Sequence, residues 1–121
     1  MKMELRLSAL ALFFVIVITA CGSSGGGGST SPMVATGTYP AFITVDPSGK
    51  FAYAANWGSN NISAYTINTT TGALTAGTAV AAGTNPTSIT VDPSGKFAYV
   101  TNEGDNTISV YPINTTTGAI Q

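Results

Sequence analysis

The sequence predicts an all-β fold, and three observations predict it. The string ITVDPSGKFAY occurs twice without change, at 43–53 and at 89–99, an offset of 46 residues. Around it, residues 37–74 and 83–120 align with 27 identities in 38 positions. Each copy also divides into short segments rich in β-branched and aromatic residues, with turn residues between them. Four short strands in a repeat of this length are typical of β-propeller blades.

The first strand of each copy is predicted at 40–46 and 86–92. Each contains the β-branched run Ile-Thr-Val, and an Asp-Pro-Ser-Gly tetrapeptide ends it. This tetrapeptide favours a type I turn, because Asp, Pro and Gly occupy its first, second and fourth positions. We therefore expect a tight hairpin into a second strand at 51–56 and 97–102, where aromatic and small residues alternate.

A polar loop leads from the second strand to a third one, predicted at 62–67 and 108–113. The string Asn-Thr-Thr-Thr-Gly then turns the chain towards a fourth, outer strand, predicted at 74–82. The second copy reaches Gln121 where its outer strand should begin. Four tyrosines lie at matching places in the second and third strands, and we expect all of them in the core between blades: Tyr53, Tyr65, Tyr99 and Tyr111.

The start of the folded part aligns with the end of an outer strand, because residues 33–38 match 79–84. In closed propellers a leading outer strand often completes the last blade. We therefore assign 34–82 to an outer strand plus a first blade, and 83–121 to a second blade without its outer strand. The fold class is thus about two four-stranded antiparallel blades of a larger ring.

Two blades are fewer than the four to eight or so of known rings, and fewer than about three repeats seldom fold alone. Three explanations remain open. The chain is a fragment of a longer propeller, or several chains assemble into one ring, or the chain is only partly folded. Three copies would supply six blades and four copies eight. We favour the fragment, because two blades cannot supply the ring that the repeats require.

The first 20 residues are predicted to be a secretory signal. Lys2 and Arg6 precede an apolar run at 7–20, which is short for a membrane span of about 20 residues. The run ends in Ile-Thr-Ala-Cys, which resembles the lipobox of bacterial lipoproteins. This resemblance implies that Cys21, the only cysteine, becomes the first mature residue and carries a lipid. We expect a protein anchored to a membrane of the bacterial cell envelope, facing the periplasm or the cell surface.

The composition of the remaining chain predicts a tether and argues against a nucleic-acid partner. Residues 21–33 are mostly Gly, Ser and Thr, which predicts a flexible tether. Residues 33–121 contain four carboxylates, two lysines, no His and no Arg. Two lysines cannot form the basic face that phosphate backbones require, so no nucleic-acid partner is expected. No cofactor or metal motif is present, and we expect neither group.

A family resemblance comes from residues 99–102, which spell Tyr-Val-Thr-Asn, and from the repeat around them. The repeat resembles that of YVTN-type, seven-bladed lactonase-like propellers, including the 6-phosphogluconolactonase-like ones. The first copy departs from the signature, with Tyr-Ala-Ala-Asn at 53–56. The resemblance implies seven blades and lactone hydrolysis. It marks the fold far more specifically than the function, because propellers host many unrelated activities.

Small-molecule sites of propellers usually lie at the mouth of the central channel, here at loops 37–40, 56–61, 83–86 and 102–107. Lactone hydrolysis needs an activated nucleophile and an oxyanion stabiliser, and a phosphorylated substrate needs Arg or clustered Lys. No catalytic residue of the family can be assigned to this chain. We expect a binding or scaffold module that is not an enzyme by itself. The alternative is part of a lactonase whose site lies in further blades.

Five residues of these loops are candidates for contact with a small molecule or sugar: Asn56, Trp57, Asn102, Glu103 and Asp105. The two carboxylates could act as a pair or bind calcium, but the stretch lacks the EF-hand pattern and favours a solvated loop. Trp57 could stack on a sugar, and packing at the loop edge is the simpler interpretation. Asn56 and Asn102 could contact a ligand, although such residues more often bond their own loop.

Overall fold

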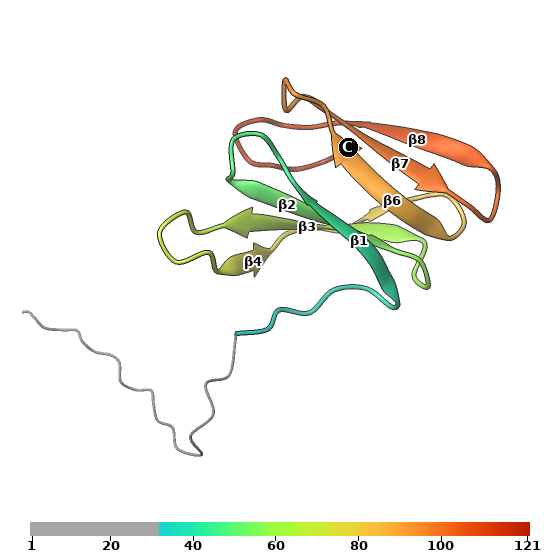
Figure 1. The fold of residues 1–121 in the computed structure, drawn as a ribbon, viewed down its shortest axis with the longest axis horizontal. Coiled ribbons are helices and arrows are strands. Elements are labelled where there is room, and N and C mark those ends of the chain that lie inside the picture. The colour runs from blue at the N-terminus through green and yellow to red at the C-terminus, as the bar shows by residue number, and fades with distance from the viewer. Residues whose placement is uncertain (1–31) are drawn as a thin grey trace, which may run out of the picture. The chain divides into compact units, whose positions relative to one another are not determined.

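The computed structural model describes residues 32–121, and residues 33–121 form one compact unit (Figure 1). The predicted signal, the predicted lipid attachment site at Cys21 and nearly all of the predicted tether lie outside the described residues. Within residues 32–121, no helix has the length and apolar character that crossing a bilayer requires.

Two antiparallel sheets confirm the all-β prediction. Blade 1 has the strand order β1-β2-β3-β4, and a fifth short strand, β5, also pairs with β3. Blade 2 has the order β6-β7-β8. The strands are β1 (Pro40–Val45), β2 (Phe51–Asn56), β3 (Asn61–Ile67), β4 (Leu74–Ala76), β5 (Val80–Ala81), β6 (Pro86–Val91), β7 (Phe97–Asn102) and β8 (Thr107–Pro112).

The hairpin turns form as the Asp-Pro-Ser-Gly string predicts. The Gly49 amide donates to the Asp46 carbonyl at 3.0 Å, and Gly49 has a φ of 75°. The Asp46 carboxylate accepts from the Ser48 hydroxyl at 2.7 Å and from the Phe51 amide at 3.0 Å. Burial alone would raise the pKa of Asp46. The hydrogen bonds to the carboxylate have the larger combined effect, so the pKa of Asp46 is lowered. Asp92 repeats the arrangement in blade 2, and its pKa is lowered chiefly by the Ser94 hydroxyl.

The outer strand of blade 1 differs from the prediction, because it is divided. β4 pairs with the end of β3, and β5 pairs with its start. The Gly77 amide still donates to the Ala64 carbonyl at 2.8 Å, which continues the β4 pairing. The register then shifts by one residue, because Tyr65 lies opposite Ala76 whereas Ile62 lies opposite Val80. In blade 2 the residues up to Gln121 form one isolated bridge at the corresponding place, between Ile113 and Ile120.

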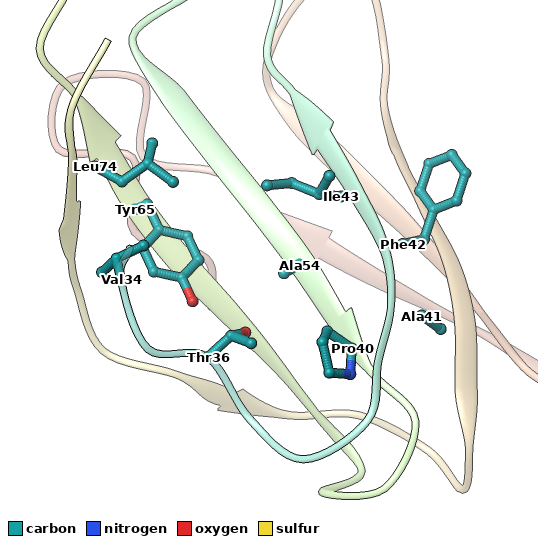
Figure 2. A pocket seen from close by; sticks show the side chains of 9 residues that line it. All are labelled: Val34, Thr36, Pro40, Ala41, Phe42, Ile43, Ala54, Tyr65 and Leu74. Atoms are coloured by element: carbon teal, nitrogen blue, oxygen red, sulfur yellow. The ribbon is translucent and has the colours of Figure 1, made fainter. Parts of the chain in front are cut away.

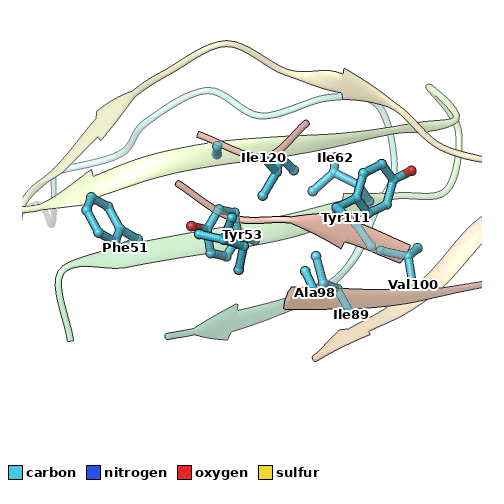
Figure 3. Close-up of a cluster of buried hydrophobic side chains, with 11 residues drawn as sticks. Phe51, Tyr53, Ile62, Ile89, Ala98, Val100, Tyr111 and Ile120 are labelled. Atoms are coloured by element: carbon cyan, nitrogen blue, oxygen red, sulfur yellow. The ribbon is translucent and has the colours of Figure 1, made fainter. Parts of the chain in front are cut away.

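The blades pack face to face around β2, which is buried along its whole length. Side chains alternate across a strand, so Phe51, Tyr53 and Ala55 face blade 2. They form the main core with Ile62 of β3 and with residues of β6–β8 (Figure 3). The Tyr53 hydroxyl donates to the Gly118 carbonyl across this interface at 2.8 Å. Burial, with the nearby Asp46 charge, raises the pKa of Tyr53 to about 12.

The four tyrosines do not share the one environment that the repeat predicted. Tyr53 and Tyr111 belong to the core between the blades. Tyr65 is buried in a smaller cluster on the other face of blade 1, with Ala52 and Ala54. Tyr99 is 39% exposed, although it occupies the place of Tyr53 in the repeat. The reason is that blade 1 covers only one face of blade 2.

Candidate functional site

The loops before the first strand and after the second strand of each blade meet at one end of the sheets. In blade 1 the Trp57 amide donates to the Tyr39 carbonyl at 2.8 Å. In blade 2 the Glu103 amide donates to the Asn85 carbonyl at 3.0 Å. We call the residues of these four loops, 37–39, 57–60, 83–85 and 103–106, the loop-end surface. They correspond to the loops in which the sequence placed a ligand site.

The loop-end surface is continuous from blade 1 to blade 2, because Asn85 connects them. Its backbone amide donates to the Asn60 side-chain oxygen at 2.7 Å, and its side-chain amide donates to the Trp57 carbonyl at 3.1 Å. Trp57 and Glu103 therefore both bond to Asn85, one from each blade. The sequence analysis did not identify Asn85.

Asn56 and Asn102, two of the predicted ligand contacts, are buried beneath this surface. The Asn56 amide donates to the Asn61 side chain at 2.8 Å and to the Ser63 hydroxyl at 2.9 Å. The Asn102 amide donates to the Ser109 hydroxyl at 2.8 Å. The sequence predicts bonding within the own loop as the alternative to ligand contact, whereas these bonds go to side chains of the next strand, β3 in blade 1 and β8 in blade 2. Their hydrogen-bonding groups point into the protein and position the loops.

Trp57 is exposed at the loop-end surface, as a residue that contacts a ligand must be. Its ring lies against Tyr39 in an edge-to-face arrangement, with centroids 6.3 Å apart and an angle of 75° between the planes. Tyr39 is even more exposed and has a φ of 51°. Sequence reasoning missed Tyr39, although one signal was available: the second copy has Asn85, a residue that tolerates a positive φ, at this place.

Glu103 and Asp105 are both exposed, but their surroundings differ. The Asp105 carboxylate accepts from the Thr107 hydroxyl at 2.5 Å and from the Thr84 amide at 3.0 Å. The bond from Thr107, and then that from Thr84, lower the pKa of Asp105. Asp105 thus fastens two loops together. Among residues 32–121 no group of three His, Cys, Asp or Glu side chains is arranged to hold a metal ion.

A hollow of about 330 Å³ lies on the face of blade 1 that points away from blade 2, and it reaches Thr36 and Pro40 at either end of the 37–39 loop (Figure 2). Its lining is almost entirely apolar and includes Val34, Ile43, Ala54, Tyr65 and Leu74. No titratable group other than the Tyr65 phenol lines it. The Tyr65 hydroxyl donates to the Ala35 carbonyl at 2.7 Å, so this phenol already has a hydrogen-bond partner within the protein.

Comparison with known proteins identifies relatives of the fold. The model of the family of seven-bladed β-propeller lactonases matches residues 27–121. A functionally unknown protein from Desulfotomaculum acetoxidans is 32% identical over 70% of this chain and 26% of its own, with a TM-score of 0.65. No curated protein matches.

Two Bacteroides structures are also similar, each named a "putative 6-phosphogluconolactonase". The B. fragilis protein is 26% identical over 65% of this chain and 22% of its own, with a TM-score of 0.63. The B. uniformis protein is 25% identical over 73% of this chain and 26% of its own, with a TM-score of 0.66. This chain therefore spans about a quarter of the length of these three proteins.

Proposed function

This chain belongs to the family of seven-bladed β-propeller lactonases, and from that premise we propose that its two blades bind a sugar-derived ring at the loop-end surface. The observation that carries the proposal is the exposed pair of Tyr39 and Trp57 in the same surface as Glu103. The C–H face of a sugar ring packs well on a flat aromatic ring, and a carboxylate beside it accepts hydroxyl hydrogen bonds.

The proposed role is binding rather than hydrolysis, for a chemical reason. Lactone opening needs a nucleophile with a base to activate it, and donors that stabilise the oxyanion. The folded part of the chain contains neither His nor Arg. Its exposed Asp105 is already engaged by Thr84 and Thr107. Glu103 alone does not make up such a site.

Tryptophan fluorescence tests the binding directly, because Trp57 is the only tryptophan in the chain. We expect saturable changes on titration with 1,5-anhydroglucitol, a sugar ring that cannot hydrolyse. Tyr39→Ala should weaken binding about ten-fold, a loss of roughly 1.4 kcal/mol, which is the size of one good aromatic contact. Phe42→Ala, which removes an exposed aromatic ring outside the loop-end surface, should leave binding unchanged. A titration with no saturable change would contradict the proposal.

The second candidate function is lactone hydrolysis, favoured by the family match and by the names of the two Bacteroides proteins. In this alternative the two blades bind the substrate and further blades of a ring supply the reacting groups. Hydrolysis of glucono-1,5-lactone by the same sample separates the two functions. We expect the rate of the buffer alone. Faster hydrolysis, lost in Tyr39→Ala, would establish the chain itself as a lactonase.

We also propose, from the N-terminal sequence, that the protein is exported and anchored to a membrane of the cell envelope. An apolar run followed by Ile-Thr-Ala-Cys supports export and lipid attachment at Cys21. We expect Cys21→Ser to abolish incorporation of a labelled fatty acid and to release the protein from bacterial membranes. Ser23→Ala, which changes a neighbouring residue of the tether, is the control. A Cys21→Ser protein that still incorporates the label would overturn this assignment.

A further inference from the structure

The loop-end surface has the same backbone shape in both blades. Tyr39 and Asn85 occupy matching places, and both have a positive φ, of 51° and 54°. Asn60 and Asn106 match in the same way, with φ values of 55° and 56°. The two blades therefore hold the side chains of these loops in equivalent positions. A difference in residue type is then a difference in what the surface presents to a ligand.

The side chains at these matching places differ in kind between the blades. Of the seven places that match in the loops, four are identical. The other three hold two aromatic residues and a hydroxyl in blade 1, and an amide and two carboxylates in blade 2: Tyr39, Trp57 and Ser59 against Asn85, Glu103 and Asp105. Blade 1 thus contributes aromatic rings to the surface, and blade 2 contributes negative charge.

The aromatic and the charged parts meet where the two blades join. The Asn85 side-chain amide donates to the Trp57 carbonyl at 3.1 Å, and the Asn85 carbonyl accepts from the Glu103 amide at 3.0 Å. A single residue therefore separates Trp57 from Glu103, and both of their side chains are exposed. This junction lies between two blades that the chain itself contains.

The charge of the loop-end surface is negative, because the two lysines of the folded part lie at the other end of the strands. Lys50 and Lys96 precede β2 and β7, whereas the loop-end surface follows these strands. Each strand has 6 residues. At about 3.3 Å per residue such a strand is about 20 Å long, more than twice the screening length of about 8 Å at physiological ionic strength. The lysines therefore do not compensate the charges of Glu103 and Asp105.

We infer that the loop-end surface selects a sugar ring that carries an ammonium group, an amino sugar, over neutral and phosphorylated sugars. This inference rests on the proposed sugar binding and adds its charge selectivity. The ring packs on Trp57, and its ammonium group lies between the indole and the Glu103 carboxylate, where cation–π and charge attraction act together. A phosphate group on the same ring meets like charge instead.

Three ligands that share one ring test the selectivity in the full chain, through the fluorescence of Trp57. They are 1,5-anhydroglucitol, its 2-amino-2-deoxy form and its 6-phosphate, at about pH 6, where aliphatic amines are protonated and carboxylates are ionised. We expect the amine to bind about five-fold tighter than the neutral ring, and the phosphate about five-fold weaker, as exposed charge contacts allow. Acetylation of the amine removes its charge and should remove its advantage.

Glu103→Gln tests whether this carboxylate carries the selectivity, because glutamine keeps the size of the side chain and removes its charge. We expect the amine's advantage over the neutral ring to fall from about five-fold to below about two-fold. Thr115→Lys is the control. It changes the net charge by the same amount in an exposed turn that follows β8, at the other end of the strands, and should leave the three affinities unchanged.

The same titrations separate a failure of this inference from a failure of the proposed function. Saturable binding of all three ligands with equal affinity would overturn the charge selectivity and leave sugar binding in place. Tighter binding of the phosphate than of the amine would do the same. No saturable change with any of the three would overturn both.

Discussion

Tyr53→Ala is expected to destabilise the protein by about 3–5 kcal/mol, the usual cost of deleting a buried aromatic side chain. Tyr53 is among the largest fully buried side chains, and its hydroxyl bonds the Gly118 carbonyl of blade 2. The variant therefore loses packing and a hydrogen bond at the centre of the interface between the blades. Urea denaturation followed by circular dichroism measures the loss.

Tyr99→Ala is the matched control, because Tyr99 lies in the same Gly-Lys-Phe-Ala-Tyr string. We expect this variant to lose less than half as much stability as Tyr53→Ala, because the Tyr99 side chain is 39% exposed. Equal losses from the two variants would contradict the arrangement of the blades, because they would place both tyrosines in equivalent environments.

Gly118→Ala is expected to cost more than Gly72→Ala, although both glycines end the same Asn-Thr-Thr-Thr-Gly turn. Gly72 has a φ of 78° and Gly118 a φ of 77°, so alanine meets the same backbone strain of about 1–2 kcal/mol at each. A methyl group at Gly118 would lie 2.6 Å from Cγ of Phe51 in blade 1, whereas one at Gly72 would meet nothing within 4 Å.

The difference between the two glycine variants measures the packing of blade 2 on blade 1. Overpacking of a core typically costs about 1–3 kcal/mol, and we expect Gly118→Ala to exceed Gly72→Ala by that amount. Thermal unfolding of dilute samples provides the two values. If Gly72→Ala costs as much as Gly118→Ala, the turn of blade 2 does not lie against Phe51.

The strands could be predicted from sequence because the signals that specify them are local. The Asp-Pro-Ser-Gly turns and the alternation at 51–56 and 97–102 appear in the structure at the predicted places. The division of the outer strand could not be predicted, because it is a one-residue shift in how this strand pairs with β3, and that pairing joins segments distant in sequence. The unequal burial of Tyr53 and Tyr99 could not be predicted either. The two tyrosines lie in identical strings, and the string does not indicate which face of its blade another blade covers.

Part of the candidate site was predicted from local signals, and the part that depends on contacts between distant loops was missed. The loops that form it follow from the strand order, and Trp57, Glu103 and Asp105 do lie exposed at the loop-end surface. Tyr39 and Asn85 join it through contacts between loops that are distant in sequence. The amides of Asn56 and Asn102 turn inward because hydroxyl and amide groups of the neighbouring strand satisfy them there. A single sequence indicates the loop but not the direction of the side chain.

Hydroxyl-radical footprinting of Tyr53 and Tyr99 tests the central claim most directly: one repeated surface is covered in blade 1 and open in blade 2. Peptide mass spectrometry distinguishes the two tyrosines, because different residues follow them. In dilute protein we predict rapid oxidation of Tyr99, which is 39% exposed, and strong protection of Tyr53, which is fully buried. Equal oxidation of the two residues in dilute, folded protein would contradict the claim.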